Sequence, residues 1–184
     1  APRDAARFPS GARPVDLDVG CGVGLHPIQL AQQEPNRTIV GIERTKTRFT
    51  RFARRLAHHP QLENVIPVWD DAVSWICHRV PPASVSRIFL LYPNPYPKPS
   101  QRNKRWYAMP FAARLIQCLI PGGTLHLATN AGSYAEEARH VFVSHWGLDL
   151  RSETSPLRAR THFERKYLAR GDACVNLIFQ RPEA

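Results

Sequence analysis

The sequence predicts an α/β fold in which a mostly parallel, seven-stranded sheet carries helices on both faces. Two observations support this class. Short runs rich in β-branched residues alternate with segments of helical periodicity, which is typical of βαβ units. The first run also ends in a glycine-rich turn that leads into a helix, as parallel sheets often have at a ligand site. The length of 184 residues suffices for one core, so we expect a single domain over residues 1–184.

The pattern assigns each element in chain order. The apolar or β-branched runs predict five strands, at 14–19, 38–42, 65–68, 87–91 and 124–129. Segments of helical periodicity predict five helices, at 25–33, 45–58, 72–79, 107–119 and 133–146. Pro121-Gly122-Gly123 is expected to end the fourth helix, because neither residue type continues it well. Residues 148–179 are expected to hold the last two strands, separated by a polar, basic stretch.

The charge balance of the chain favours a polyanionic partner. Lys and Arg number 25 against 15 Asp and Glu, which gives a net charge of +10. Nucleic acid is favoured over a membrane surface, because no basic amphipathic anchor is evident. No apolar run reaches the roughly 18 residues of a membrane span, and residues 1–13 have no signal-peptide core and predict a trimmed or frayed terminus. We therefore expect a soluble, cytoplasmic protein.

The cysteines give no sign of a metal site. Cys21, Cys77, Cys118 and Cys174 are far apart and form no C-x-x-C pair, whereas structural zinc needs close pairs. We expect no bound metal and four reduced thiols that fill space.

The turn after the first strand has the pattern of a cofactor site. It reads Asp18-Val19-Gly20-Cys21-Gly22-Val23-Gly24, and its glycines permit a sharp turn and close approach to a ligand. Glu43 ends the second strand about 20 residues later, where a carboxylate can accept both ribose hydroxyls. Leu25 stands where dinucleotide sites usually have a third glycine, and Asp18 suits an ammonium group. A Rossmann-like site for S-adenosylmethionine is therefore favoured over one for NAD.

A further acidic pair, Asp70-Asp71, follows the third strand and is placed to reach the adenine edge of this cofactor. Each acid taken singly has a simpler interpretation, as a helix cap or a solvated turn. The cofactor interpretation depends on their combination with the glycine turn.

A proline-rich loop follows the fourth strand directly. Residues 92–105 hold four prolines and seven basic or amide side chains, at the edge of the sheet where parallel folds bind ligands. Lys104 and Arg105 are the expected phosphate ligands of an RNA. The basic clusters are 44–55, 98–105 and 158–170, and the aromatic residues in or beside the last two are Tyr96, Trp106, Tyr107, Phe163 and Tyr167. These rings can stack an extruded base, whereas the first cluster is equally well explained as a solvated helix.

Several segments resemble the bacterial tRNA (guanine-N7-)-methyltransferases over residues 16–179. The motifs are the turn 18–24, Gly41-Ile42-Glu43, Asp71-Ala72, the loop 92–98 with Asn103-Lys104-Arg105, and Thr161-His162-Phe163-Glu164. The loop and the last motif are specific to that family. The resemblance implies a class I methyltransferase fold, S-adenosylmethionine as cofactor and guanine N7 in tRNA as the methylated atom.

The resemblance also implies roles for individual residues. The family's cofactor contacts fall on Asp18, Glu43, Asp71 and Asn94, which join the contacts at Gly20, Gly22 and Gly24 expected from the turn itself. The guanosine contacts fall on Lys98, Asn130, Thr161 and Glu164.

The chain departs from the family pattern at two of these positions and at one further residue of the loop. Asn94 and Asn130 stand where the family has aspartate, and Tyr96 stands where it has tryptophan. Guanine N7 carries a lone pair and no proton, so its methylation needs no general base. A carboxylate would stabilise the cationic product, and Asn94, the candidate catalytic residue, offers only a dipole.

Three alternative functions remain open. Asn94-Pro95-Tyr96 also resembles the asparagine–proline–proline–aromatic motif of amino-group methyltransferases, which favours an exocyclic amine of RNA as substrate. A non-catalytic protein that binds the cofactor and RNA is a second alternative. A small-molecule methyltransferase is a third, although it would need neither the basic loop nor the charge of +10.

Overall fold

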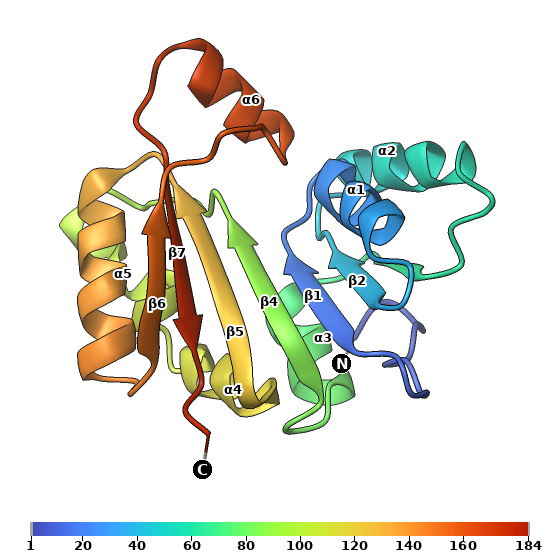
Figure 1. Ribbon diagram of the computed structural model, residues 1–184, viewed down its shortest axis with the longest axis horizontal. Coiled ribbons are helices and arrows are strands. Elements are labelled where there is room, and N and C mark those ends of the chain that lie inside the picture. The colour runs from blue at the N-terminus through green and yellow to red at the C-terminus, as the bar shows by residue number, and fades with distance from the viewer. Residues whose placement is uncertain (1, 184) are drawn as a thin grey trace.

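A seven-stranded sheet forms the centre of the protein, and the computed structural model describes residues 2–183 (Figure 1). Across the sheet the strands are β3 (Val65–Val68), β2 (Thr38–Ile42), β1 (Val15–Val19), β4 (Val85–Leu91), β5 (Leu119–Thr129), β7 (Val175–Gln180) and β6 (Asp149–Thr154). Strands β1 to β5 are parallel, and β7 runs antiparallel to both of its neighbours. The mostly parallel sheet predicted from the sequence is confirmed.

Helices cover both faces of this sheet. They are α1 (Leu25–Gln33), α2 (Lys46–Ala57), α3 (Ala72–Arg79), α4 (Phe111–Cys118), α5 (Gly132–Ser144) and α6 (His162–Ala169), with short 3-10 turns η1 (Pro99–Lys104) and η2 (Trp106–Ala108). One apolar cluster packs α1 and α2 on one face, through Ile28 and Phe52. A larger cluster packs α3, α4 and α5 on the other, through Trp75, Leu115 and Phe142. Helix α6 lies beyond the carboxyl ends of the central strands (Figure 1).

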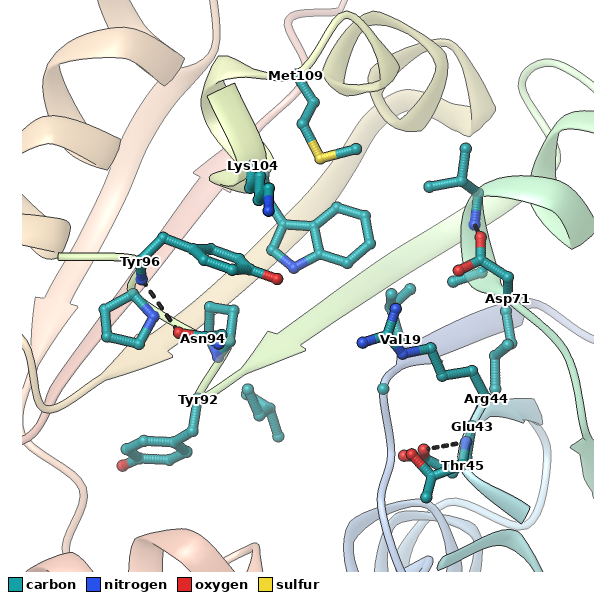
Figure 2. Close-up of a pocket in the computed structure, with 18 of the residues that line it drawn as sticks. Val19, Glu43, Arg44, Thr45, Asp71, Tyr92, Asn94, Tyr96, Lys104 and Met109 are labelled. Atoms are coloured by element: carbon teal, nitrogen blue, oxygen red, sulfur yellow. Dashed lines mark hydrogen bonds between the residues drawn. The ribbon is translucent and has the colours of Figure 1, made fainter. Parts of the chain in front are cut away.

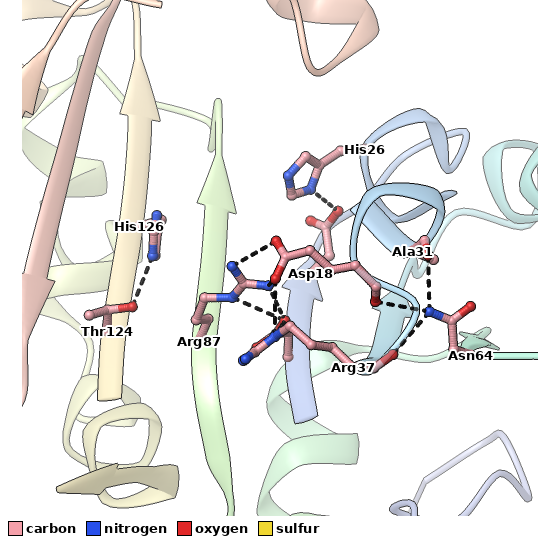
Figure 3. A network of polar contacts seen from close by, with 10 residues as sticks. Asp18, His26, Ala31, Arg37, Asn64, Arg87, Thr124 and His126 are labelled. Carbon is pink, nitrogen blue, oxygen red and sulfur yellow. Dashed lines mark hydrogen bonds and ion pairs between the residues drawn. The ribbon is translucent and has the colours of Figure 1, made fainter. Parts of the chain in front are cut away.

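The alternation of side chains along β1 separates its apolar residues from its acids. Val15, Leu17 and Val19 belong to the larger apolar cluster, so the intervening acids point to the face of α1 and α2. Asp16 is fully buried there and accepts hydrogen bonds from Arg37 Nε at 2.7 Å and Arg87 Nη2 at 2.6 Å. A buried carboxylate needs such partners, and this one ties β1 to β4 through Arg87, whose side chain extends from β4 in Figure 3.

Two expectations about the elements were wrong. The expected helix at 107–119 is divided by Pro110 into η2 and α4, because proline has no N–H for a helix interior. Strand β5 begins at Leu119 and runs through the Pro-Gly-Gly segment. The last two strands, β6 and β7, are present as expected, and the polar stretch between them also contains α6, whose first turn is capped by Thr161: its Oγ1 accepts the N–H of Glu164 at 3.0 Å.

The expected frayed start of the chain was also wrong, because this segment packs against the end of β3. Asp70 Oδ2 accepts the N–H groups of Arg3 at 2.6 Å and Asp4 at 3.0 Å. Asp4 Oδ2 in turn accepts the N–H of Trp69 at 2.7 Å. A sequence pattern does not reveal such pairings, because the partners lie more than 60 positions apart.

Among residues 2–183, no helix combines the length and the apolar character that a membrane crossing requires.

Candidate active site

A cavity of about 700 Å³ opens where β1, β2 and β4 end (Figure 2). Gly20, Glu43 and Asp71 line it on the side of β2 and β3, and Asn94 and Tyr96 line it on the side of the proline-rich loop. A second cavity of about 200 Å³ lies against the glycine turn, the start of α2 and the start of α6. The expected cofactor turn and the expected substrate loop thus share one cavity.

The glycine turn leaves room for a ligand at two of its three glycines. Gly20, Gly22 and Gly24 all have left-handed backbone, with φ of 74°, 62° and 78°. A Cβ added at Gly20 or Gly22 would meet no atom within 4 Å, and both residues line a cavity. A Cβ at Gly24 would overlap the ring of Phe52. Gly24, expected as a cofactor contact, is therefore corrected to a packing position that lets α2 approach the turn.

Glu43 is held rigidly at the end of β2. Its side chain is 3% exposed, its Oε2 accepts the N–H of Gly22 at 3.0 Å, and its Oε1 accepts the N–H of Thr45 at 2.7 Å. Each carboxylate oxygen keeps a second lone pair. The carboxylate is therefore fixed beside the glycine turn with acceptor capacity for ribose hydroxyls.

Asp18 lies on the opposite side of the same turn and lines the smaller cavity. Its Oδ2 is 2.8 Å from His26 Nδ1 on α1, and both side chains are buried (Figure 3). The aromatic ring of Phe89 packs edge-on against His26, with ring centroids 4.8 Å apart. Asp18 is thus oriented by a neighbour that the sequence reasoning did not identify, because no motif links a histidine of α1 to this acid.

Asp71 caps a helix, which is one of the two interpretations that the sequence left open, and it also faces the larger cavity. It lines the larger cavity, and its Oδ1 caps α3 by accepting the N–H groups of Val73 at 3.0 Å and Ser74 at 3.3 Å. The cap fixes the side chain at the rim of the cavity next to the end of β3.

The loop after β4 has left-handed backbone at two tyrosines. The φ angles of Tyr92 and Tyr96 are 54° and 44°, a conformation that costs L-residues roughly 1–2 kcal/mol each. Asn94 Oδ1 accepts the N–H of Tyr96 at 3.1 Å and stabilises the turn (Figure 2). Arg105 Nη2 and Nε donate to the Tyr96 carbonyl at 2.9 and 3.2 Å. Strain of this kind is typical of functional loops.

Tyr92 connects this loop to α6. Its hydroxyl donates to Glu164 Oε1 at 2.7 Å, and its ring lies 5.4 Å from that of Tyr167. Burial and the adjacent Glu164 carboxylate raise the pKa of Tyr92 far above its usual value, so the hydroxyl remains a donor. The sequence reasoning missed Tyr92, although its position directly after β4 was a usable signal.

Two residues that were expected to bind the substrate are instead occupied by hydrogen bonds and ion pairs within the protein, so their expected roles are corrected. Arg105 is 8% exposed and forms an ion pair with Glu137, so its guanidinium supports the loop and does not face solvent. Glu164 is fully buried, and its oxygens accept from Tyr92 and from Arg160 at 2.6 and 3.1 Å. Although burial opposes ionisation, the Arg160 and Tyr92 hydrogen bonds keep the pKa of Glu164 below its usual value. Neither side chain reaches the cavity.

The remaining expected substrate residues have different positions. Lys104 is exposed, lines the larger cavity and places its Nζ 5.9 Å from the centroid of Tyr96. Thr161 lines the smaller cavity. Lys98 is exposed on the loop, and Asn130 donates a hydrogen bond to Asp172 Oδ2 at 3.2 Å. Neither residue lines the larger or the smaller cavity.

Comparison with known proteins identifies the family. Residues 12–177 match a family described as "Putative methyltransferase". A tRNA (guanine-N(7)-)-methyltransferase of Halorhodospira halophila is 31% identical over 179 residues, which cover 94% of this chain and 77% of that protein. The enzyme of the same name from Acidithiobacillus ferrooxidans is 33% identical over 175 residues, which cover 92% of this chain and 76% of that protein. The chain belongs to the tRNA (guanine-N7-)-methyltransferase family.

The fold of this tRNA methyltransferase family member also matches solved methyltransferases. The crystal structure of the 16S rRNA methyltransferase KamB superimposes with a TM-score of 0.68 at 22% identity, covering 92% of this chain and 88% of that one. TYW2 of M. jannaschii in complex with AdoMet gives a TM-score of 0.58 at 16% identity, covering 94% and 70%. The predicted Rossmann-like, class I methyltransferase fold is confirmed.

The site fits the cofactor of this methyltransferase family, S-adenosylmethionine. The glycine turn leaves open space at Gly20 and Gly22, and the fixed carboxylate of Glu43 stands beside it. Asp18 lines the smaller cavity and Asp71 the larger one, where an ammonium group and an adenine amino group would find acceptors.

Proposed function

We propose that the protein transfers the methyl group of S-adenosylmethionine to N7 of a guanine in tRNA. The observation that carries this proposal is the single cavity that joins Gly20 and Glu43 to Asn94, Tyr96 and Lys104. The tRNA methyltransferases to which the chain is similar supply the class of RNA.

Methyl transfer to guanine N7 does not require the protein to remove a proton. The cofactor supplies a methyl group bound to a positively charged sulfur, and guanine N7 attacks it with a lone pair that carries no proton. The protein must therefore bind the base, aim N7, exclude water and stabilise the positive charge that appears on the guanine.

Asn94 supports N7 over an exocyclic amine as the methylated atom. Its Oδ1 already accepts the N–H of Tyr96 at 3.1 Å, so the amide presents its NH₂ group as a donor. The N7 edge of guanine offers two acceptors, N7 and O6, and an amide donor can pair with O6. An exocyclic amine would instead have to pair with the second lone pair of Asn94 Oδ1.

Aromatic side chains surround the part of the cavity assigned to the base. Tyr96, Trp106, Phe163 and Tyr167 line it, whereas the acids among its described lining residues, Glu43, Asp70 and Asp71, lie on the side of β2 and β3. Ring faces stack bases and attract cations, which contributes about 0.5–2 kcal/mol per favourable contact. We assign the stabilisation of the methylated, cationic guanine to these rings.

The first test is mass spectrometry of nucleosides from unmodified tRNA incubated with the protein and S-adenosylmethionine. The proposal expects 7-methylguanosine. A methylated exocyclic amine as the product would support the amino-group alternative, and no transfer of a labelled methyl group to any RNA would support a non-catalytic binder.

Asn94→Asp tests the assigned charge development. A carboxylate beside the cation is expected to raise the single-turnover rate at saturating cofactor. Electrostatic groups at such positions contribute roughly 2.7–4 kcal/mol, against about 0.5–1.5 kcal/mol for the neutral hydrogen bond that is lost. A slower reaction with a product other than 7-methylguanosine would contradict the proposal.

Asn103→Asp is the matched control for this variant. Asn103 is an amide on the same loop and lines the same cavity, so the substitution adds an equal charge at a position with no assigned catalytic contact. Acceleration in Asn94→Asp but not in Asn103→Asp locates the effect at residue 94.

A further inference from the structure

Helix α2 carries a run of cations that have no acidic partners. The segment from Arg44 to His58 contains no Asp or Glu, and its six exposed cations are Arg44, Lys46, Arg48, Arg51, Arg54 and Arg55. Within residues 2–183 none of the six forms an ion pair. The arginines that do form ion pairs are Arg37, Arg87, Arg105, Arg139, Arg151, Arg160 and Arg170. Six exposed cations without an acidic partner thus lie between Arg44 and Arg55.

The stability of the helix itself does not explain these residues. Lys46 and Arg48 occupy the first turn of α2, which has no acid, and cations there oppose the helix dipole. Arg51 has like-charged neighbours three or four positions away, at Arg48, Arg54 and Arg55, and such pairs repel along a helix. A polyanion on this face would relieve both effects.

The apolar side of α2 fixes which way the cations point. Phe52 is fully buried under the glycine turn, where it fills the space left by Gly24 and Gly41. Arg48, Arg51 and Arg55 follow each other at spacings of three and four residues and therefore share one stripe of the helix, with Arg54 beside it. We call these four residues the α2 arginine face. The 12 residues of α2 make it about 18 Å long, enough to meet several phosphates.

The α2 arginine face is continuous with the active site. Arg48 lines both cavities, and Arg51 lines the smaller one together with His162 at the start of α6. The Arg48 guanidinium lies 5.5 Å from the ring centroid of Phe163 on α6. Helices α2 and α6 both lie at the end of the sheet to which the central strands point (Figure 1). A strand of RNA that places a base in the larger cavity would pass next to this face.

We propose that the α2 arginine face binds backbone phosphates of the RNA whose base enters the cavity. The identity of this RNA as a methylation substrate rests on the proposed function. Guanidinium groups form two-pronged hydrogen bonds with phosphate, and the glycine turn packed on Phe52 places these phosphates on the cofactor side of the cavity. Lys104 lies on the opposite, loop side, so the RNA backbone is held from two sides.

The test compares two double variants with the same loss of charge. Arg51→Gln with Arg54→Gln alters the α2 arginine face. Arg139→Gln with Arg151→Gln is the control, because these residues lie on α5 and β6 at the other edge of the sheet. Arg51→Lys with Arg54→Lys restores the charge. Binding of unmodified tRNA is measured over a range of salt concentrations, together with cofactor affinity by calorimetry and the KM and kcat for tRNA.

The α2 double variant is expected to bind tRNA at least about tenfold more weakly and to reduce the slope of log K against log salt by roughly 1.4–1.8, which corresponds to two lost phosphate contacts. The KM for tRNA rises accordingly, and calorimetry with the cofactor measures how much of any change in kcat comes from Arg51, which lines the smaller cavity. The lysine variant recovers most of the slope, and the control keeps the wild-type slope.

Other results overturn the inference. Equal losses in the α2 variant and the control would mean that only net charge matters, and wild-type affinity in the α2 variant would mean that the face is solvated. A third result would make the α2 arginine face a membrane contact: the wild type binds phosphatidylserine vesicles, the α2 variant does not, and the two have the same affinity for tRNA. If wild type forms no 7-methylguanosine but only the α2 variant loses salt-dependent RNA binding, the proposed function fails and the phosphate face stands.

Discussion

Arg105→Ala distinguishes two roles that a cation in this loop can have: support of the loop conformation and contact with an RNA phosphate. The guanidinium donates two hydrogen bonds to the Tyr96 carbonyl, at 2.9 and 3.2 Å, and pairs with Glu137. These contacts hold Tyr96 at a φ of 44°, against a strain of roughly 1–2 kcal/mol. Hydrogen bonds from a charged donor contribute about 1.5–3 kcal/mol, which offsets this strain. Without them the strain is no longer offset, and the loop leaves this conformation more often.

The expected effect is a lower population of the active loop. A loss of about 1.5–3 kcal/mol corresponds to roughly a 10- to 150-fold smaller equilibrium ratio of active to inactive loop, since 1.4 kcal/mol is tenfold. The rate of methyl transfer at saturating tRNA and cofactor should therefore fall by about 10- to 100-fold. Cofactor affinity by calorimetry and the salt slope of tRNA binding should not change, because Arg105 faces neither ligand.

The opposite pattern would refute this reasoning. A salt slope smaller by roughly 0.7–0.9, with an unchanged saturating rate, is the signature of one lost phosphate contact and would return Arg105 to the role predicted from sequence. Arg102→Ala is the matched control, since Arg102 is exposed on the same loop. The substitution removes the same charge, but no side-chain contact to Tyr96 is lost.

Four further substitutions test the cofactor turn and the core. Glu43→Gln should weaken cofactor binding at least about tenfold in calorimetry, because charge-assisted hydrogen bonds contribute about 1.5–3 kcal/mol each. Gly24→Ala should lower the free energy of unfolding by about 2–5 kcal/mol in urea, from left-handed strain and overlap with Phe52. Gly20→Ala should lower the free energy of unfolding by the backbone strain alone, about 1–2 kcal/mol. Unlike Gly24→Ala, it should also weaken the binding of the cofactor. His126→Gln should reduce the loss of stability between pH 6.5 and pH 4.

The pH dependence of the last variant follows from the pKa of His126. Burial, together with Arg87 and Arg160, lowers that pKa from 6.5 to about 4. Between these values the unfolded chain binds a proton that the native protein does not, so stability falls as pH drops from 6.5 to about 4 and stays lower below it. The difference corresponds to about 3 kcal/mol at most. Urea titrations with the same pH dependence in wild type and variant would contradict the assignment.

The sequence by itself determined the sheet and one side of the site. β-Branched runs and helical periodicity located β1 to β5 and their helices, because these patterns reflect local conformational preference and one-sided burial. Gly20, Glu43 and Asp71 each follow a parallel strand, and parallel strands end at one edge, so their meeting in one cavity followed from sequence alone. The family resemblance added the loop that lines the other side of the cavity.

Only the tertiary structure decided what each side chain of the loop and of α6 does. Lys104 and Arg105 are adjacent cations with the same sequence context, yet one lines the cavity and the other is buried against Glu137, 32 positions away. Glu164 was expected at the substrate and is instead fully buried between Arg160 and Tyr92, the latter 72 positions away. A buried charge is stable only where partners meet it in space, and partners so distant along the chain leave no periodic trace in the sequence.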